Sequence, residues 1–156
     1  MKRKMAWILG TFFGTGRSPL APGTVGSAGA VLVLLLLPAS YYTWLTAGLF
    51  VLATAIGPWL ADVLMAETGT KDPGFFVLDE CAGMWLAALR FDKPSLTVMA
   101  ACFFAFRAFD VIKPWPVGRL EALPGGIGVV LDDVAAGALA LATTVVGARL
   151  LEMLLA

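Results

Sequence analysis

Residues 18–61 read SPLAPGTVGSAGAVLVLLLLPASYYTWLTAGLFVLATAIGPWLA and contain no Asp, Glu, Lys or Arg. A helix that crosses a membrane needs about 20 consecutive apolar residues, so the interval has room for up to two such helices. Pro38, Ala39 and Ser40 predict a break between them, with one helix over roughly 28–37 plus its flanks and the other over 44–61. This stretch therefore favours a fold embedded in a membrane.

The composition of the whole chain also favours a membrane environment. Hydrophobic residues make up 60% of the 156 residues and charged residues 14%, against about 45–50% and about 25% in soluble domains. Eleven basic residues balance eleven acidic ones, so bulk charge gives no reason to expect nucleic acid as a partner. The chain has no histidine and two cysteines, which excludes histidine metal sites, histidine general bases and a disulfide-rich scaffold.

Beyond residue 61 the hydrophobic segments are shorter, at 81–89, 94–106 and 134–148, and no useful strand alternation appears. We expect one all-α domain over 1–156, a multi-helical integral membrane protein of about four to five helices with Gly/Pro-rich re-entrant or interfacial loops. The basic residues Lys2, Arg3, Lys4 and Arg17 predict a retained N-terminal segment on the cytoplasmic side.

Two acid pairs stand at the heads of apolar segments. Asp79-Glu80 and Asp132-Asp133 are each preceded by a glycine turn, and in each pair a glycine follows one acid by four residues. That spacing puts the glycine on the acid's helical face, where another helix can come close. Converging carboxylates would repel one another without a cation, and oxygen ligands alone favour Mg²⁺ or Mn²⁺ over Zn²⁺. The alternative is two capped helices without a metal.

Two further segments carry polar groups. Arg107, Asp110 and Lys113 recur every third residue and line one helical face, either as a stabilising ion ladder or as cations for a phosphate group. The glycine-rich segment 14–27 offers the Thr24 and Ser27 hydroxyls before the long apolar run. It suits either an anion at a helix start or a membrane re-entry loop that caps the next helix.

A divalent-metal site beside two cations suits hydrolysis of a phosphate ester by a metal-activated water. The chain lacks the C-x5-R and D-x-D-x-[TV] motifs and histidine, which excludes three other phosphatase chemistries. A small membrane transporter or channel subunit, with the acid pairs as a cation pathway, remains an alternative, and so does a structural membrane partner.

Six segments together resemble one family, the phosphatidylglycerophosphatase A family. They are GTG at 14–16, SPLAPGTVGS at 18–27, KDPG at 71–74, DECAG at 79–83, FRAFDVIKPWP at 106–116 and GGIGVVLDDVAAG at 125–137. The resemblance implies an inner-membrane, Mg²⁺-dependent enzyme that removes the terminal phosphate of the lipid phosphatidylglycerophosphate, with its active site on the cytoplasmic side. It gives no oligomeric state.

The same resemblance implies roles for individual residues. The metal-binding and water-activating carboxylates would be Asp79, Glu80, Asp132 and Asp133, with Asp72 as a further metal ligand. Arg107 and Lys113 would hold the phosphoryl oxygens, while Asp110 would orient them or reach the metal. Thr24 and Ser27 would lie on the phosphate side.

Overall fold

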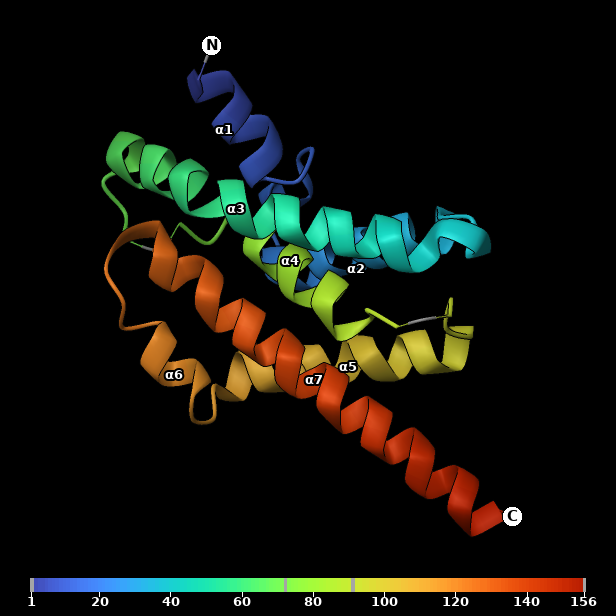
Figure 1. Ribbon diagram of the computed structural model, residues 1–156. Helices are drawn as coiled ribbons and strands as arrows, with labels where there is room; N and C mark the ends of the chain where they lie inside the picture. The colour runs from blue at the N-terminus through green and yellow to red at the C-terminus, as the bar shows by residue number, and fades with distance from the viewer. Residues whose placement is uncertain (1, 72, 91, 156) are drawn as a thin grey trace.

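The computed structural model describes residues 2–71, 73–90 and 92–155 (Figure 1), and within these ranges it contains helices and no strand. The α-helices are α1 (Lys2–Gly10), α2 (Pro22–Leu36), α3 (Tyr42–Thr68), α4 (Leu78–Ala87), α5 (Leu96–Ile112), α6 (Val117–Leu120) and α7 (Gly125–Leu155), with 3₁₀ turns at Thr15–Arg17 and Ala39–Tyr41. The all-α prediction is confirmed. The expected four to five helices are too few, because α1 and the four-residue α6 lie outside the apolar segments that were counted.

Five helices, α2, α3, α4, α5 and α7, form a bundle in which α3 and α5 run from right to left and α7 returns from upper left to lower right (Figure 1). The short helix α4 lies at the centre and contacts the other four. Most of its residues are buried, as expected for a helix that is apolar nearly all round. Helix α1 packs against α3, and its last residue is tied to the start of α4, since the Val77 amide donates a hydrogen bond of 2.8 Å to the Gly10 carbonyl.

The uncharged interval folds as two helices with a break, as predicted, but only one is long enough to span a membrane. Helix α2 has 15 residues, short of the approximately 20 that a span requires. Residues 39–68 and 125–155 form the two long apolar helical segments, each with a mean hydropathy of 1.8. Pro58 lies inside α3 without ending it.

Helix α7 begins earlier than the sequence indicates. The segment 125–128, expected to be a glycine turn before the acid pair, is already the first turn of the helix. The Gly126 amide donates a hydrogen bond of 2.7 Å to Asp62 Oδ1 on α3, which satisfies one of the free donors at a helix start. A side chain on Gly126 would collide with the Pro58 carbonyl, so glycine is required here by close packing of α7 on α3.

Candidate active site

A polar cavity of about 410 Å³ opens at the end of the bundle where α4 and α7 begin and α5 finishes. Its charged lining residues are Lys71, Asp79, Glu80, Asp110, Lys113, Glu121, Asp132 and Asp133. In a chain with so few charged residues, this concentration identifies the cavity as the candidate site.

The two acid pairs share one local geometry. Asp79 Oδ1 accepts a hydrogen bond of 2.8 Å from the Glu80 amide, and Asp132 Oδ1 accepts one of 3.0 Å from the Asp133 amide. In each pair the carboxylate of the first residue therefore accepts a hydrogen bond from the backbone amide of the second. The carboxylates of the second residues, Glu80 and Asp133, are not used in these bonds.

Glycines bring the two pairs together, as their spacing predicts. A Cβ atom on Gly83 of α4 would lie 2.5 Å from the Asp133 carbonyl oxygen, and a Cβ on Gly137 of α7 would lie 3.0 Å from the Gly83 Cα atom. Both contacts are closer than real Cβ atoms tolerate without movement. The missing side chains thus allow α4 and α7 to touch along their backbones just below the acids.

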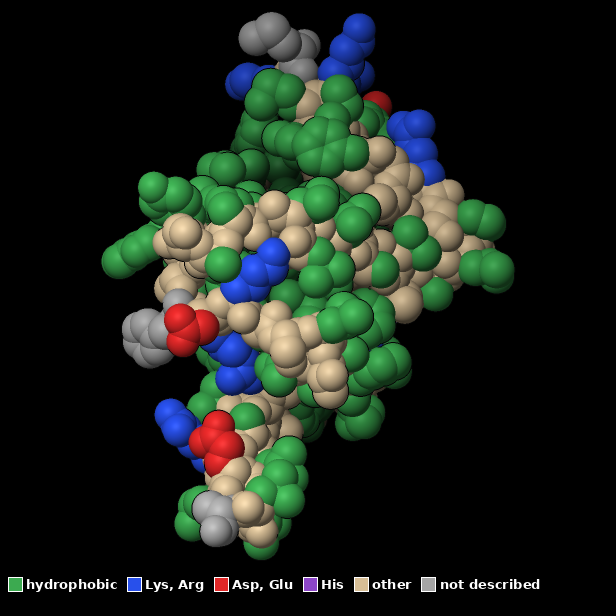
Figure 2. All heavy atoms as spheres, turned by 90° about the vertical axis from the view of Figure 1, so that its right-hand side faces the viewer, with side chains coloured by type: hydrophobic (Ala, Val, Ile, Leu, Met, Phe, Trp, Pro, Cys, Tyr) green, Lys and Arg blue, Asp and Glu red, His purple; other side chains and the backbone are tan. Residues whose placement is uncertain are grey.

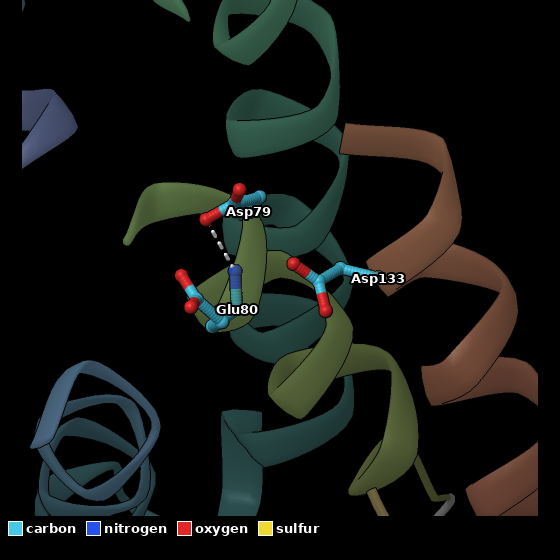
Figure 3. Close-up of side chains that lie close together, drawn as sticks. All are labelled: Asp79, Glu80 and Asp133. Atoms are coloured by element: carbon cyan, nitrogen blue, oxygen red, sulfur yellow. Dashed lines mark hydrogen bonds between the residues drawn. The ribbon is translucent and has the colours of Figure 1, made fainter. Parts of the chain in front are cut away.

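Three of the acids form a buried triad, shown in Figure 3. One oxygen from each of Asp79, Glu80 and Asp133 lies within 4.8 Å of the others. Glu80 Oε2 and Asp133 Oδ1 are buried without any hydrogen-bond partner among the described residues, a costly state for a carboxylate. The triad therefore fits a hard cation, which would supply the missing partner for both oxygens.

The pKa values of the triad acids also favour a bound cation. Burial raises the pKa of Asp79 well above its usual range, and the neighbouring Glu80 carboxylate raises it further. Burial also raises the pKa of Glu80, although its hydrogen bond with Asp79 and the nearby Arg107 guanidinium oppose this. Without a cation these acids tend to hold protons, whereas a bound divalent ion would stabilise their charged forms.

Asp132 lies apart from the triad and forms an ion pair instead. Its Oδ2 atom is 2.9 Å from Lys113 Nζ, which is also 2.6 Å from Glu121 Oε1. Partial burial alone would lower the pKa of Lys113, but its hydrogen bonds with Glu121 and Asp132 outweigh burial and raise it. Lys113 therefore stands at the cavity as a permanent positive charge.

Arg107 provides a second cation beside the triad. Its Nη1 atom is 2.6 Å from Asp110 Oδ2 and donates a hydrogen bond of 3.5 Å to Ser27 Oγ. A Cβ on Gly23 would collide with Glu80 Oε1 and lie 3.3 Å from Arg107 Nη1. The first turn of α2 can therefore pass directly over the acid and the arginine only because residue 23 has no side chain.

The remaining predicted residues are placed less directly. Thr24 is half-buried on α2 and does not belong to the residues lining the cavity. Thr24 and Ser27 lie within the first turns of α2 rather than in a loop before it. Asp72 falls outside the described residues.

Sequence reasoning missed three polar residues at or beside the site. Glu121 and Lys71 line the cavity, and Asp62 caps α7 behind it. Glu121 follows α6, in a turn with no periodicity to read, and Asp62 stands in an apolar helix far from its partner in sequence. The one available signal was that an acid interrupts the otherwise apolar helix α3 at position 62.

Comparisons with known proteins identify the family of the chain. Residues 8–148 match the family model described as Phosphatidylglycerophosphatase A. A Bacteroides thetaiotaomicron protein, provisionally named phosphatidylinositol-3-phosphatase, is 42% identical over 137 residues, which cover 83% of this chain and 85% of that protein. No solved structure matches the chain.

Two relatives carry the name of the family itself. The phosphatidylglycerophosphatase A of Escherichia coli K12 is 34% identical over 140 residues, covering 88% of this chain and 80% of that protein. The protein of the same name from Haemophilus influenzae is 35% identical over 135 residues, covering 83% and 80%.

Proposed function

The chain belongs to the phosphatidylglycerophosphatase A family, and from this membership and the buried acid triad we propose that it hydrolyses phosphatidylglycerophosphate to phosphatidylglycerol and phosphate. The reaction would depend on Mg²⁺, with Mn²⁺ as a substitute. It would serve phospholipid synthesis in a bacterial membrane.

The observation that carries this proposal is the pair of unpartnered buried oxygens, Glu80 Oε2 and Asp133 Oδ1. Together with Asp79 they offer a set of oxygen ligands of the kind that Mg²⁺ prefers. A divalent ion held there supplies charge neutralisation at the phosphoryl group and activation of a water molecule. Asp132 supports the site indirectly by fixing Lys113 at 2.9 Å, and Asp72 remains a proposed further ligand.

The two cations would bind the phosphoryl oxygens of the substrate. Lys113 Nζ contacts two carboxylates, those of Glu121 and Asp132, which leaves one of its three protons for a ligand. Arg107 uses Nη1 for Asp110 and Ser27, so the rest of its planar fork is free to hold a phosphate oxygen. Asp110 would hold Arg107 in this orientation, and Thr24 would border the same face of the site.

The distribution of basic residues supports a cytoplasmic active site in a multi-pass inner-membrane protein. Lys71 and Lys113 line the active-site cavity, and Arg107 lies beside the acid triad, whereas Arg90, Lys93 and Arg149 line a separate cavity formed by the other ends of α4 and α7. Lys2, Arg3, Lys4 and Arg17 belong to α1 and the turn after it, and Gly10 at the end of α1 is hydrogen-bonded to Val77 just before α4. Positive residues gather on the cytoplasmic side of membrane proteins. We therefore place the cavity in the cytoplasmic leaflet, where a lipid headgroup can enter it.

The test is phosphate release by the purified protein in detergent micelles, with phosphatidylglycerophosphate, phosphatidylinositol 3-phosphate, phosphatidic acid and a soluble phosphate ester as separate substrates. We expect the first to react fastest, activity to vanish with EDTA, and Mg²⁺ or Mn²⁺ to restore it. Phosphatidylinositol 3-phosphate is included because of the 42% identical relative.

Two outcomes would contradict the proposal. Full activity in chelator would remove the metal from the reaction. Cation flux into liposomes without any phosphate release would instead favour the hypothesis that the protein is a transporter, in which the acids form an ion pathway.

A further inference from the structure

A second, larger cavity of about 790 Å³ lies at the end of the bundle opposite the candidate active site. Figure 2 faces this end and shows charged side chains gathered below the middle of the view within a largely hydrophobic surface. The charged lining residues are Arg90, Asp92, Lys93, Arg149 and Glu152. None of these residues takes part in the proposed reaction.

Arg90 is the feature of this cavity that needs an explanation. Its Nη2 atom donates a hydrogen bond of 2.7 Å to Thr144 Oγ1, whereas its Nε atom is buried without a partner. Within the described residues no carboxylate lies within ion-pair distance of it. A guanidinium stays charged at any physiological pH, so a half-buried positive charge here lacks a counter-ion.

Lys93 adds a second positive charge, and no carboxylate of the described residues lies within ion-pair distance of it. Its Nζ atom donates hydrogen bonds of 2.7 and 2.8 Å to the Leu35 and Leu37 carbonyls at the end of α2. Of the two acids in the cavity, Glu152 is paired with Arg149 at 3.1 Å, and Asp92 is exposed. The cavity therefore keeps an excess of positive charge.

Most of the remaining wall is apolar, and much of it belongs to the two long helices α3 and α7. Trp44 and Ala47 of α3 and Leu141 and Val145 of α7 line the cavity. The Trp44 side chain is 79% exposed, at the start of a long apolar helix where tryptophan typically meets lipid headgroups. Positive charge at the mouth and apolar side chains along the wall match the two parts of one lipid molecule.

We propose that this cavity binds one anionic phospholipid from the leaflet opposite the active site. Its phosphate accepts hydrogen bonds from Arg90 and Lys93, and an acyl chain lies in the groove between α3 and α7. The lipid supplies the counter-ion that Arg90 lacks and closes the gap between the two helices. The site does not depend on the proposed reaction, because its residues lie at the other end of the molecule.

The experiment titrates the full-length protein, in uncharged detergent micelles, with dioleoyl phosphatidylglycerol, dioleoyl phosphatidylcholine or inorganic phosphate, and counts bound molecules by native mass spectrometry. We expect one tightly bound phosphatidylglycerol and a raised Tm, with neither effect from the other two probes. Arg90→Gln should weaken phosphatidylglycerol binding by roughly tenfold or more, as expected for loss of a charged hydrogen-bond donor.

Three further variants serve as controls for this binding experiment. Ala148→Trp adds bulk to the lining of the groove and replaces neither cation. It should also abolish binding, and it covers the case in which Arg90→Gln does not fold. Arg119→Gln, an exposed arginine at the other end, should bind as the wild type does. Lys113→Gln separates product held in the active site from lipid held here, and it should leave binding intact.

Equal binding of phosphatidylcholine, binding of inorganic phosphate alone, or loss of binding with Lys113→Gln but not with Arg90→Gln would each overturn the proposal. The readout is lipid binding, so these outcomes stand whether or not the protein hydrolyses phosphatidylglycerophosphate.

Discussion

The contact between Gly83 and the backbone of α7 sets the spacing of the acid triad, and Gly83→Ala tests this. The added Cβ would collide with the Phe106 ring of α5, a side chain that can shift, and would lie 2.5 Å from the backbone carbonyl oxygen of Asp133, whereas ordinary contacts begin near 3.4 Å. The two helices would have to separate by the difference, about 0.9 Å. Because Glu80 lies on one helix and Asp133 on the other, the carboxylates would move apart by a similar distance.

This displacement should cost activity more than stability. Overpacking of a close contact costs about 1–3 kcal/mol of unfolding free energy, part of which is offset because alanine is favoured over glycine inside a helix by about 1 kcal/mol. A misplacement of about 1 Å between reacting groups can lower turnover by roughly 100-fold. We therefore expect a folded protein with a large loss of turnover.

The assay is phosphate release at saturating Mg²⁺, together with thermal unfolding in the same detergent. Gly147→Ala is the matched control, since it lies on α7 with nothing within 4 Å of the added Cβ, and it should keep full turnover and gain stability. If Gly83→Ala stays within about threefold of this control, the glycine contact does not set the acid spacing and the reasoning is refuted.

Other predictions concern the charges themselves. Asp133→Asn should lower turnover by at least about 100-fold if the acid holds a metal ion, whereas the exposed Asp92→Asn should stay near normal; equal rates in phosphate release would contradict the triad. In metal-free protein the raised pKa values of Asp79 and Glu80 mean that the folded state binds more protons than the unfolded state. The free energy of unfolding should therefore fall as pH rises above about 4 and level off above the raised values, and Mg²⁺ should reverse this trend in denaturant titrations. Asp62→Ala removes the hydrogen bond to the first turn of α7 and should cost roughly 1 kcal/mol of unfolding free energy, seen as a lower Tm with the Mg²⁺ requirement unchanged; no change in Tm would show that water replaces the cap.

The sequence by itself determined the fold class and predicted an apolar environment and the candidate site residues. Absence of charge over 18–61 predicts helices in an apolar environment, and the proline at 38 predicts the break between two of them. The glycine four residues after an acid predicted that α4 and α7 would touch, which Gly83 and Gly137 confirm. These features depend on local composition and spacing, which a linear pattern records.

The tertiary structure alone decided which charges meet. Asp132 and Asp133 are adjacent in sequence, yet the helix directs one carboxylate to Lys113 and the other to the triad. The counter-charge of Glu121 and the cap from Asp62 come from residues whose spacing carries no signal. Which charged side chains pair depends on distances of a few ångströms between side chains on different helices. Those distances are set only when the helices pack.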